Sequence, residues 1–253
     1  MVVHHAGSVA AMEPEIRDSH RLSFGPAADL YDEVRPTYPA AAIGWMVGPA
    51  PRRVVDLGAG TGIFTRQLVA AGHQVIAVEP DPGMRARLAS RVPGAATPAG
   101  SAESVPVPDA SVDAVVAAQS YHWFDPAVAH PEIARVLVPG GVFAPIWNHR
   151  DTGVDWVAQL SGIVGGEDVI PPELPDELFG PVQRADFRHE VPSSPDLLVA
   201  LISSRSHYLT AAPAERDRLE REVRQLCATH PDLRGRDRFP MPYLTSAFRA
   251  ARR

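Results

Sequence analysis

The segment at 53–62 reads RVVDLGAGTG, and it decides the fold. Its first half is apolar and carries two β-branched valines, Val54 and Val55, which predicts a short buried strand that ends in a glycine turn. The apolar side chains of residues 63–71 then recur at helical spacing, and Gly72 suits the C-terminal cap of a helix. The sequence therefore predicts a strand, a tight turn and a helix in immediate succession.

The same alternation continues along the chain. Apolar runs predict further strands at 74–79, 112–119 and 142–147. Between them, helices are expected at 82–90 and in a segment that ends near Leu137. Repeated strand, helix and strand implies parallel pairing through right-handed crossovers. We therefore predict a doubly wound α/β fold, with helices on both faces of a mostly parallel sheet.

One helix boundary in this region has two interpretations. Asp125 and Pro126 resemble a helix start, because aspartate caps helices and proline suits the first turn. Pro131 would interrupt a helix that begins there, since proline lacks the amide hydrogen and its ring clashes with the preceding turn. The helix either begins at Pro126 or restarts at Pro131.

The second half of the chain is less regular. Residues 162–181 are rich in Gly and Pro, which indicates an extended connection or a lid. FRHEV at 187–191 predicts a strand, and 195–206 predicts a helix. A strongly amphipathic helix with a charged, solvated face is expected at 213–229, and 241–253 predicts a final strand.

The composition is that of a folded, slightly acidic protein. The 253 residues are 45% apolar and 21% charged, and the formal net charge is −6. A negative chain lacks a broad electrostatic footprint for nucleic acid, so no nucleic-acid partner is expected. No apolar stretch reaches the roughly 20 residues of a membrane helix, and the first residues do not resemble a secretion signal. The single cysteine, Cys227, cannot form an intramolecular disulfide, which fits a cytoplasmic protein.

The glycine loop is also a candidate ligand site. Glycines let a backbone approach a ligand without Cβ clashes. Glu79 ends the next predicted strand, 17 residues after Gly62, and the carboxyl ends of adjacent parallel strands meet at one edge of a sheet. An acid at that position can accept two hydrogen bonds from a ribose diol. The pattern predicts a ligand that contains a nucleoside.

The spacing of the glycines separates two such ligands. A dinucleotide site needs a third glycine near the helix, whose N-terminus binds the pyrophosphate. Ile63 occupies the position of that glycine, and glycine stands at position 62 instead. A ligand without phosphates, such as S-adenosylmethionine, has no need of an anion site. It is therefore favoured, and NAD is the alternative.

Four successive motifs resemble those of a known family. They are VVDLGAGTG, VIAVEPDPGM, GSAESVPVPDASVDAVVAAQSYHWF and EIARVLVPGGVF, and the resemblance runs from Phe24 to Asp151. The chain is similar to class I S-adenosylmethionine-dependent methyltransferases of the type 11 subgroup, and most similar to its trans-aconitate-methyltransferase-like members. YDEVRPTYP at 31–39 also resembles a signature of that subgroup. The resemblance implies a Rossmann-like, seven-stranded sheet whose last strand runs antiparallel.

The same resemblance implies a set of cofactor contacts. The loop glycines would line the methionine and ribose, Glu79 would bind the ribose hydroxyls, and the segment 101–103 would meet the adenine. Tyr31 and Arg35 would close over the cofactor, with Arg35 near its carboxylate. The implied cofactor-binding residues are Tyr31, Arg35, Asp56, Gly58, Ala59, Gly60, Thr61, Gly62, Glu79, Pro80, Asp81, Met84, Ser101, Ala102, Glu103 and Gln119.

Methyl transfer is an in-line displacement from a sulfonium. Alignment can supply much of the catalysis, and a base is needed only when the acceptor holds a proton. His122 is the candidate general base, because imidazole titrates near neutrality; a structural histidine beside the cofactor is the alternative. The candidate acceptor-binding residues are Trp123, Trp147, Asn148 and Arg150. Arg150 would suit an acceptor carboxylate, which would need no base.

These observations predict one methyltransferase domain at 20–253 after a flexible lead-in at 1–19. Within it, 20–150 would bind the cofactor, 151–212 would form the acceptor pocket or a lid, and 213–253 would close the fold. The expected reaction moves a methyl group from S-adenosylmethionine to an oxygen of a small molecule, with a carboxylate favoured over a hydroxyl, and leaves S-adenosylhomocysteine. Nitrogen and carbon are less favoured acceptor atoms. The alternatives are an NAD-dependent oxidoreductase and a cofactor-binding module without transfer chemistry. No metal site is expected, because the histidines and the cysteine lack metal-ligand spacing.

Overall fold

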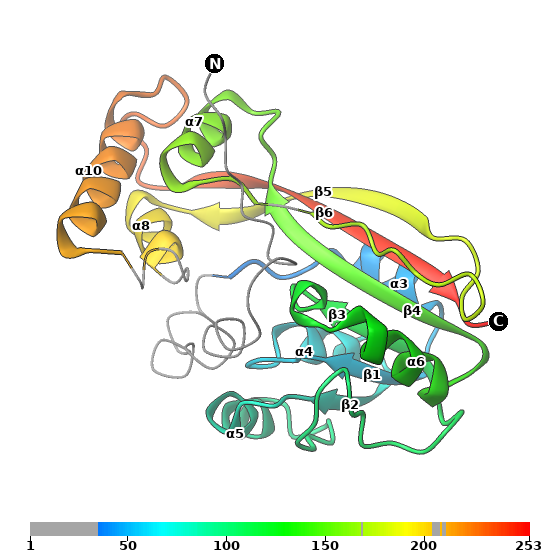
Figure 1. Ribbon diagram of the computed structural model, residues 1–253. Helices are drawn as coiled ribbons and strands as arrows, with labels where there is room; N and C mark the ends of the chain where they lie inside the picture. The colour runs from blue at the N-terminus through cyan, green and yellow to red at the C-terminus, as the bar shows by residue number, and fades with distance from the viewer. Residues whose placement is uncertain (1–34, 168, 204–207, 209–210) are drawn as a thin grey trace.

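The strands predicted on either side of the glycine loop belong to one sheet. The computed structural model describes residues 35–167, 169–203, 208 and 211–253; Tyr31 and the lead-in at 1–19 lie outside them. The six strands of the sheet are β1 (Arg53–Leu57), β2 (Gln74–Val78), β3 (Val112–Ala118), β4 (Leu137–Arg150), β5 (Gln183–Ser193) and β6 (Phe239–Ala251). Their spatial order is β2-β1-β3-β4-β6-β5 (Figure 1). The first four strands pair in parallel, whereas β6 runs antiparallel to both β4 and β5, as predicted for the last strand.

The prediction of seven strands is wrong for the described part of the chain. A seventh position beside β2 is reduced to a single parallel bridge between Ile76 and Ala96. The amide of Ala77 donates to the carbonyl of Ala96 at 2.8 Å, and the pairing extends no further as a ladder. Pro93 and Pro98 flank this bridge, and proline cannot donate to a strand ladder.

Helices cover both faces of the parallel half of the sheet. They are α3 (Ala40–Val47), α4 (Ile63–Ala70), α5 (Pro82–Arg91) and α6 (Pro126–Val136). Val54 packs with α3 and α4 in one apolar cluster, whereas Val55 and Leu57 pack with α6 in another. Because successive residues of β1 face opposite layers, both faces are buried and the doubly wound α/β fold is confirmed.

The helix α6 runs through Pro131 and does not restart there. It begins at Pro126, and the side chain of Asp125 caps it by accepting a hydrogen bond from the amide of Ala127 at 3.1 Å. His130 and Ile133, on either side of the proline, are both buried. Burial against the sheet therefore holds the helix together where the local rule predicts a break.

A second group of helices lies at the far end of the long strands. Figure 1 shows α7 (Asp155–Val164), α8 (Pro195–Ser203) and α10 (Pro213–Thr229) together, beyond the parallel half of the sheet. They share an apolar cluster with the start of β6, to which α7 contributes Trp156 and Leu160. The sequence did not indicate α7, whereas the bounds of α10 are as predicted.

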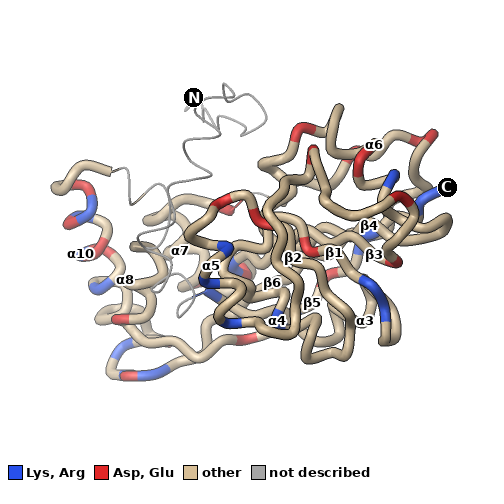
Figure 2. The backbone as a smooth tube through the Cα atoms, turned by 90° about the horizontal axis from the view of Figure 1, so that it is seen from below, with Lys and Arg blue, Asp and Glu red and all other residues tan. Residues whose placement is uncertain are grey.

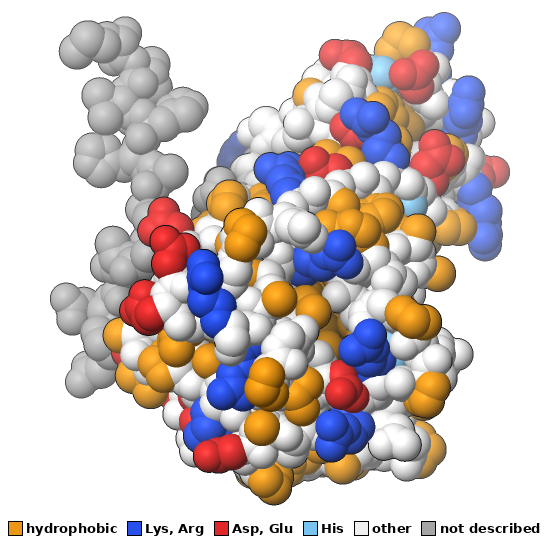
Figure 3. Space-filling view, turned by 90° about the vertical axis from the view of Figure 1, so that its right-hand side faces the viewer, with side chains coloured by type: hydrophobic (Ala, Val, Ile, Leu, Met, Phe, Trp, Pro, Cys, Tyr) orange, Lys and Arg blue, Asp and Glu red, His pale blue; other side chains and the backbone are white. Residues whose placement is uncertain are grey.

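The surface of the described residues mixes charges of both signs. Acidic and basic positions alternate along α10 (Figure 2), where Arg218 pairs with Glu222 at 2.7 Å, as the spacing predicts. The face seen in Figure 3 carries basic, acidic and apolar side chains side by side. Among the described residues, no helix combines the length and the apolar character needed to cross a membrane.

Candidate active site

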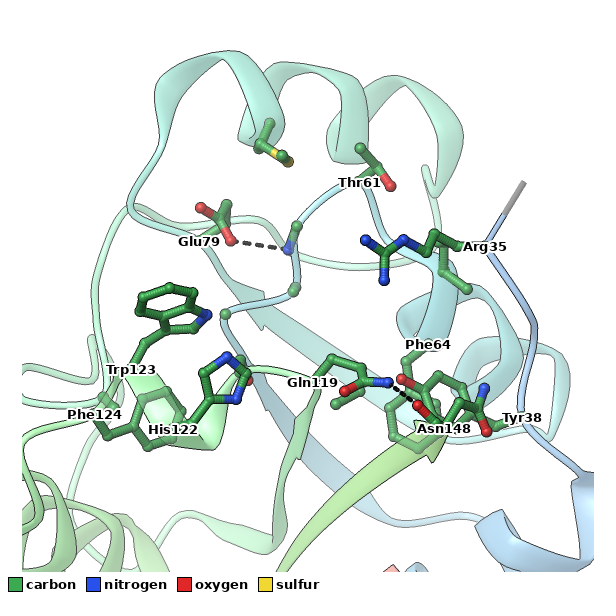
Figure 4. A pocket seen from close by; sticks show the side chains of 18 of the residues that line it. Arg35, Tyr38, Thr61, Phe64, Glu79, Gln119, His122, Trp123, Phe124 and Asn148 are labelled. Carbon is green, nitrogen blue, oxygen red and sulfur yellow. Dashed lines mark hydrogen bonds between the residues drawn. The ribbon is translucent and has the colours of Figure 1, made fainter. Parts of the chain in front are cut away.

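A cavity of about 280 Å³ opens where β1, β2 and β3 end at their carboxyl edges (Figure 4). Fifteen of the residues singled out in the sequence line it: Arg35, Gly58, Ala59, Gly60, Thr61, Glu79, Pro80, Met84, Ser101, Ala102, Glu103, Gln119, His122, Trp123 and Asn148. The other lining residues are Pro36, Tyr38, Ile63, Phe64, Ala118, Ser120, Phe124, Glu167, Leu201 and Tyr243. The fold thus brings most of the predicted site residues to one cavity.

The glycine loop has a backbone that other residues would not readily adopt. Gly58 and Gly60 have φ values of +66° and +57°, in the left-handed region. A Cβ on Gly58 would lie 2.7 Å from the Cβ of Ser120, which is too close. A Cβ on Gly60 would meet only the Sδ of Met84, at 3.9 Å, so the cavity is open beside this residue. The loop is shaped so that a ligand can approach its backbone.

Glu79 connects this loop to the start of α5. Its Oε2 accepts a hydrogen bond from the amide of Gly60 at 2.8 Å, and its Oε1 accepts one from the amide of Asp81 at 2.9 Å. Only 7% of the residue is exposed. A carboxylate offers about four lone-pair sites, so it can hold both amides and also accept from a diol in the cavity.

Three predicted cofactor residues lie outside the cavity. Asp56 is 1% exposed beneath the loop, and its Oδ2 accepts a hydrogen bond from the hydroxyl of Thr65 at 2.7 Å. Burial, together with the charge of Glu79, raises the pKa of Asp56 to about 7. The other two residues serve α5. Asp81 caps this helix by accepting from the amide of Met84 at 2.7 Å, and a Cβ on Gly62 would lie 2.5 Å from Leu88 Cδ1.

The segment predicted to meet the adenine forms a small closed turn. Ser101 and Ser104 exchange backbone hydrogen bonds of 3.2 Å. Glu103 then accepts a hydrogen bond from the amide of Asp125 at 3.0 Å, which ties the turn to the start of α6. The turn therefore faces the cavity from a fixed position.

The end of β3 supplies the polar floor of the cavity. Gln119 has a φ of +56°, which is uncommon for a residue other than glycine. The ring of His122 lies against Trp123, with centroids 4.8 Å apart. Burial lowers the pKa of His122 to about 4, so the imidazole is neutral at pH 7.

Two of the predicted acceptor residues turn away from the cavity. Trp147 is 2% exposed and packs edge-on against Tyr121 and Phe248 in the core. Arg150 is also 2% exposed; its backbone amide donates to Glu167 Oε2 at 2.7 Å, and its Nε lies 3.4 Å from the same oxygen. Neither side chain is among the residues that line the cavity: Trp147 packs into the core, and Arg150 is held by Glu167.

Glu167, Leu201 and Tyr243 reach the cavity from distant parts of the chain. They come from the connection after α7, from α8 and from β6. No local pattern marks them, since each stands in an ordinary stretch of its element. Tyr38 and Phe64, whose rings meet edge-on at 4.9 Å, complete this side.

Comparison with known proteins places this chain in a family. Residues 55–144 match the family described as a methyltransferase domain. The chain is 44% identical over 231 residues to an uncharacterized methyltransferase of Mycobacterium tuberculosis, a match that covers 90% of this chain and 95% of that protein. The chain belongs to the class I S-adenosylmethionine-dependent methyltransferases. This membership leaves the oxidoreductase hypothesis without support.

Two further proteins are similar to this methyltransferase over different lengths of the chain. A solved structure of a methyltransferase from Anaeromyxobacter dehalogenans is 26% identical, has a TM-score of 0.58, and covers 86% of this chain and 97% of its own. The malonyl-acyl-carrier-protein O-methyltransferase of Methylococcus capsulatus is 38% identical over 136 residues, which is 49% of each chain. The first similarity spans both halves of the fold, and the second spans half of each chain.

The low pKa of His122 gives this methyltransferase a testable response to acid. The folded pKa of about 4 lies below the ordinary value of 6.5, so below pH 6.5 the unfolded chain binds the proton more readily. The contribution of neutral His122 to the free energy of unfolding is therefore fully present above pH 6.5, and it is lost as the pH falls toward 4. His122→Gln should remove this loss, a difference of about 2 kcal/mol at pH 4.5. Urea unfolding of both proteins at pH 7.5 and 4.5 measures it, and equal acid losses would contradict the prediction.

Proposed function

We propose that this methyltransferase transfers a methyl group from S-adenosylmethionine to an oxygen of a small molecule. The observation that carries the proposal is a single cavity that joins the glycine loop and Glu79 to Gln119 and His122. In this proposal, 20–150 hold the cofactor and contribute Tyr38 and Phe64 to the acceptor side, which 151–212 form together with β6. Glu167 and Leu201, which line the cavity from 151–212, support that division.

The described residues fit the cofactor. The open space beside Gly60 admits a ligand close to the backbone, and Glu79 is placed to accept from the ribose hydroxyls. Arg35 reaches from the opposite wall toward the loop (Figure 4), where it would hold the carboxylate of the methionine part. The bound cofactor supplies a methyl group on a sulfonium, and the neutral rings of His122 and Trp123 would adjoin that charge without repelling it.

The acceptor side is aromatic, and Glu167 is the one charged residue of the described lining that is not assigned to the cofactor. Tyr38, Phe64, Leu201 and Tyr243 line it, which suits a flat and largely apolar molecule. The charged residues among the described lining are Arg35, Glu79, Glu103 and Glu167. Arg150, the cation expected to bind an acceptor carboxylate, instead pairs with Glu167. These features favour an acceptor that enters uncharged.

The basicity of His122 narrows the acceptor further. A base whose pKa is about 4 is poorly matched to an ordinary alcohol, because general-base catalysis works best when the pKa lies near the working pH. A phenol or an enol loses its proton far more readily. We therefore favour an uncharged acceptor with an acidic hydroxyl, from which neutral His122 accepts the proton as the methyl–oxygen bond forms.

A carboxylate is the second candidate acceptor. It is already a nucleophile, so its methylation needs no general base. The resemblance of the sequence motifs to trans-aconitate-type members and the half-length similarity to an O-methyltransferase both favour it. If it is correct, His122→Ala retains most of the activity; a hydroxyl acceptor predicts a loss of about 100-fold or more.

Calorimetric titration with S-adenosylmethionine, S-adenosylhomocysteine and NAD tests the cofactor, and an acceptor panel tests the reaction. Micromolar binding of the first two ligands alone is expected. The panel then pairs each phenol with the carboxylic acid of the same ring, and counts methyl transfer from labelled cofactor. Preferential methylation of the phenols supports the hydroxyl proposal, and preferential methylation of the acids overturns it in favour of the second candidate. A folded protein that binds NAD, or none of the three, overturns both.

Glu167 should influence this choice between acceptors. In Glu167→Gln a carboxylate on the acceptor side becomes neutral, which removes repulsion of anionic ligands. We expect kcat/KM for carboxylic acids to rise about 10-fold relative to that for phenols. Removing the repulsion between two like charges lowers the free energy of the bound acid by about 1.4 kcal/mol, which corresponds to 10-fold. Thermal unfolding of the variant controls for loss of the contact with Arg150. An unchanged ratio in a folded variant would place Glu167 outside acceptor recognition.

A further inference from the structure

Two walls of the cavity are bonded to one residue, Asn148: the first to its side chain and the second to its backbone carbonyl. The first wall is the segment 35–38, of which Arg35, Pro36 and Tyr38 line the cavity. The second is Gln119 at the end of β3. These walls are far apart in the sequence, and Asn148 on β4 bonds to both of them. Figure 4 shows its bond with Gln119.

Asn148 fixes the backbone of the first wall. Its Nδ2 donates to the carbonyl of Thr37 at 3.0 Å and to that of Pro36 at 3.3 Å. Its Oδ1 accepts a hydrogen bond from the hydroxyl of Thr245, the residue directly opposite on β6. With 4% of the residue exposed, the carboxamide is oriented by the sheet on one side and grips the segment on the other.

A second carboxamide grips the same segment one residue further along. Gln67 on α4 accepts from the amide of Tyr38 at 2.9 Å and donates to its carbonyl at 2.6 Å. Asn148 and Gln67 together account for the carbonyls of three successive residues, 36–38. The position of Arg35, directly before them, therefore follows from these two clamps.

Asn148 also supports the second wall through its main chain. The Nε2 of Gln119 donates to the carbonyl of Asn148 at 2.6 Å, and the amide of Gln119 donates to Ile146 at 3.0 Å. Gln119 needs such support because its φ of +56° is unfavourable for a side chain of this kind. Both walls are thus bonded to the same part of β4, residues 146–148.

We propose that Asn148 is a positioning residue of the cofactor site, and that it acts mainly by holding Arg35 in place. The sequence suggested that it binds the acceptor, but both ends of its side chain are occupied by the protein itself. The inference rests on the proposed role of Arg35 at the cofactor carboxylate. It predicts that Asn148 and Arg35 are not independent in cofactor binding.

A double-mutant cycle on the dissociation constant of S-adenosylhomocysteine tests this dependence. Asn148→Ala should weaken binding about 10-fold in the otherwise unchanged protein, but no more than about 3-fold when Arg35 is already alanine. A 10-fold loss in both backgrounds would show that the residues act independently and would overturn the proposal. An unchanged constant in a folded Asn148→Ala protein would overturn it too.

His149→Ala is the matched control. His149 neighbours Asn148 on β4 and also bonds to β6, through Ser246 at 3.0 Å, but it does not line the cavity. It should leave the dissociation constant within about 2-fold. An equal loss in this variant would mean that sheet stability is being measured, and would overturn the proposal.

Asn148→Asp serves if the alanine variant does not fold. Aspartate keeps an acceptor for Thr245 but turns a second acceptor toward the carbonyls of Pro36 and Thr37, so a loss of about 10-fold is still expected. Binding at full strength by this variant would overturn the inference. If the unsubstituted protein does not bind S-adenosylhomocysteine at all, the cofactor proposal itself fails, a result distinct from failure of Asn148 alone.

Discussion

Glu79→Ala is expected to weaken binding of S-adenosylmethionine and S-adenosylhomocysteine by about 100-fold or more. The substitution leaves the amides of Gly60 and Asp81 without the carboxylate that now accepts from them at 2.8 and 2.9 Å. It also removes the proposed acceptor for the ribose hydroxyls. Hydrogen bonds to a charged group contribute about 1.5–3 kcal/mol each, and 100-fold corresponds to about 2.7 kcal/mol. Isothermal calorimetry of the folded variant measures the loss.

Two further variants define what the loss means. Glu79→Gln keeps the shape and one acceptor oxygen, so it should fall between the wild-type protein and the alanine variant. Glu132→Gln is the control, because Glu132 likewise accepts from a backbone amide, that of Val105 at 2.8 Å, but lies outside the cavity. It should lower stability without changing cofactor affinity. If the affinity of the Glu79→Ala protein for the cofactor is within 3-fold of the wild-type value, Glu79 does not bind the cofactor as proposed.

Gly60→Val and Gly62→Val should have large effects of opposite kinds. At Gly60, a Cβ meets only Met84 Sδ at 3.9 Å, so valine would fill the space that the ligand approaches. Cofactor affinity should fall by about 100-fold or more. The free energy of unfolding should fall by only about 1–3 kcal/mol, because valine is strained at this φ. At Gly62, a Cβ would lie 2.5 Å from Leu88 and 2.9 Å from Val92. This variant should lose about 3 kcal/mol or more of stability through overpacking and strain.

Chemical denaturation and calorimetry on the same preparations separate the two effects. Gly60→Val should unfold at a denaturant concentration lowered only by its backbone strain, and the folded variant should fail to bind. Gly62→Val should unfold much earlier, and what remains folded should still bind. If Gly60→Val binds normally, the ligand does not approach the loop backbone, and the proposed position of the cofactor is wrong.

The cofactor half of the site could be predicted because its signals are local. The apolar run of β1, the glycines and the acid at the end of β2 lie in one continuous stretch. The positions of Gly60 and Glu79 follow from the geometry of a strand, a turn and a helix. The same local patterns could not separate residues that face the cavity from those that face the protein. Asp56 lies beneath the loop, and Gly62 and Asp81 serve the packing and capping of α5.

The proposed acceptor side depends on contacts between distant segments. Trp147 and Arg150 follow the parallel half of the sheet as candidate residues should, but burial of aromatic area and pairing with Glu167 turn them inward. Pro131 is an example in secondary structure of tertiary packing overriding a local preference. The helix α6 continues through this proline because it packs against the sheet. Glu167, Leu201 and Tyr243 meet at the cavity only because the connection after α7, α8 and β6 come together there.

By itself, the sequence determined the alternation of strands and helices, the glycine loop and the acid that faces it. Each of these follows from spacing along the chain and from the conformations that individual residues allow. Only the tertiary structure decided that Asn148 bonds to two walls of the cavity, that Arg150 holds a glutamate of the protein, and which distant side chains line the cavity. Those outcomes depend on which distant surfaces bury each other. The free energy gained by that burial is larger than the conformational preferences of individual residues.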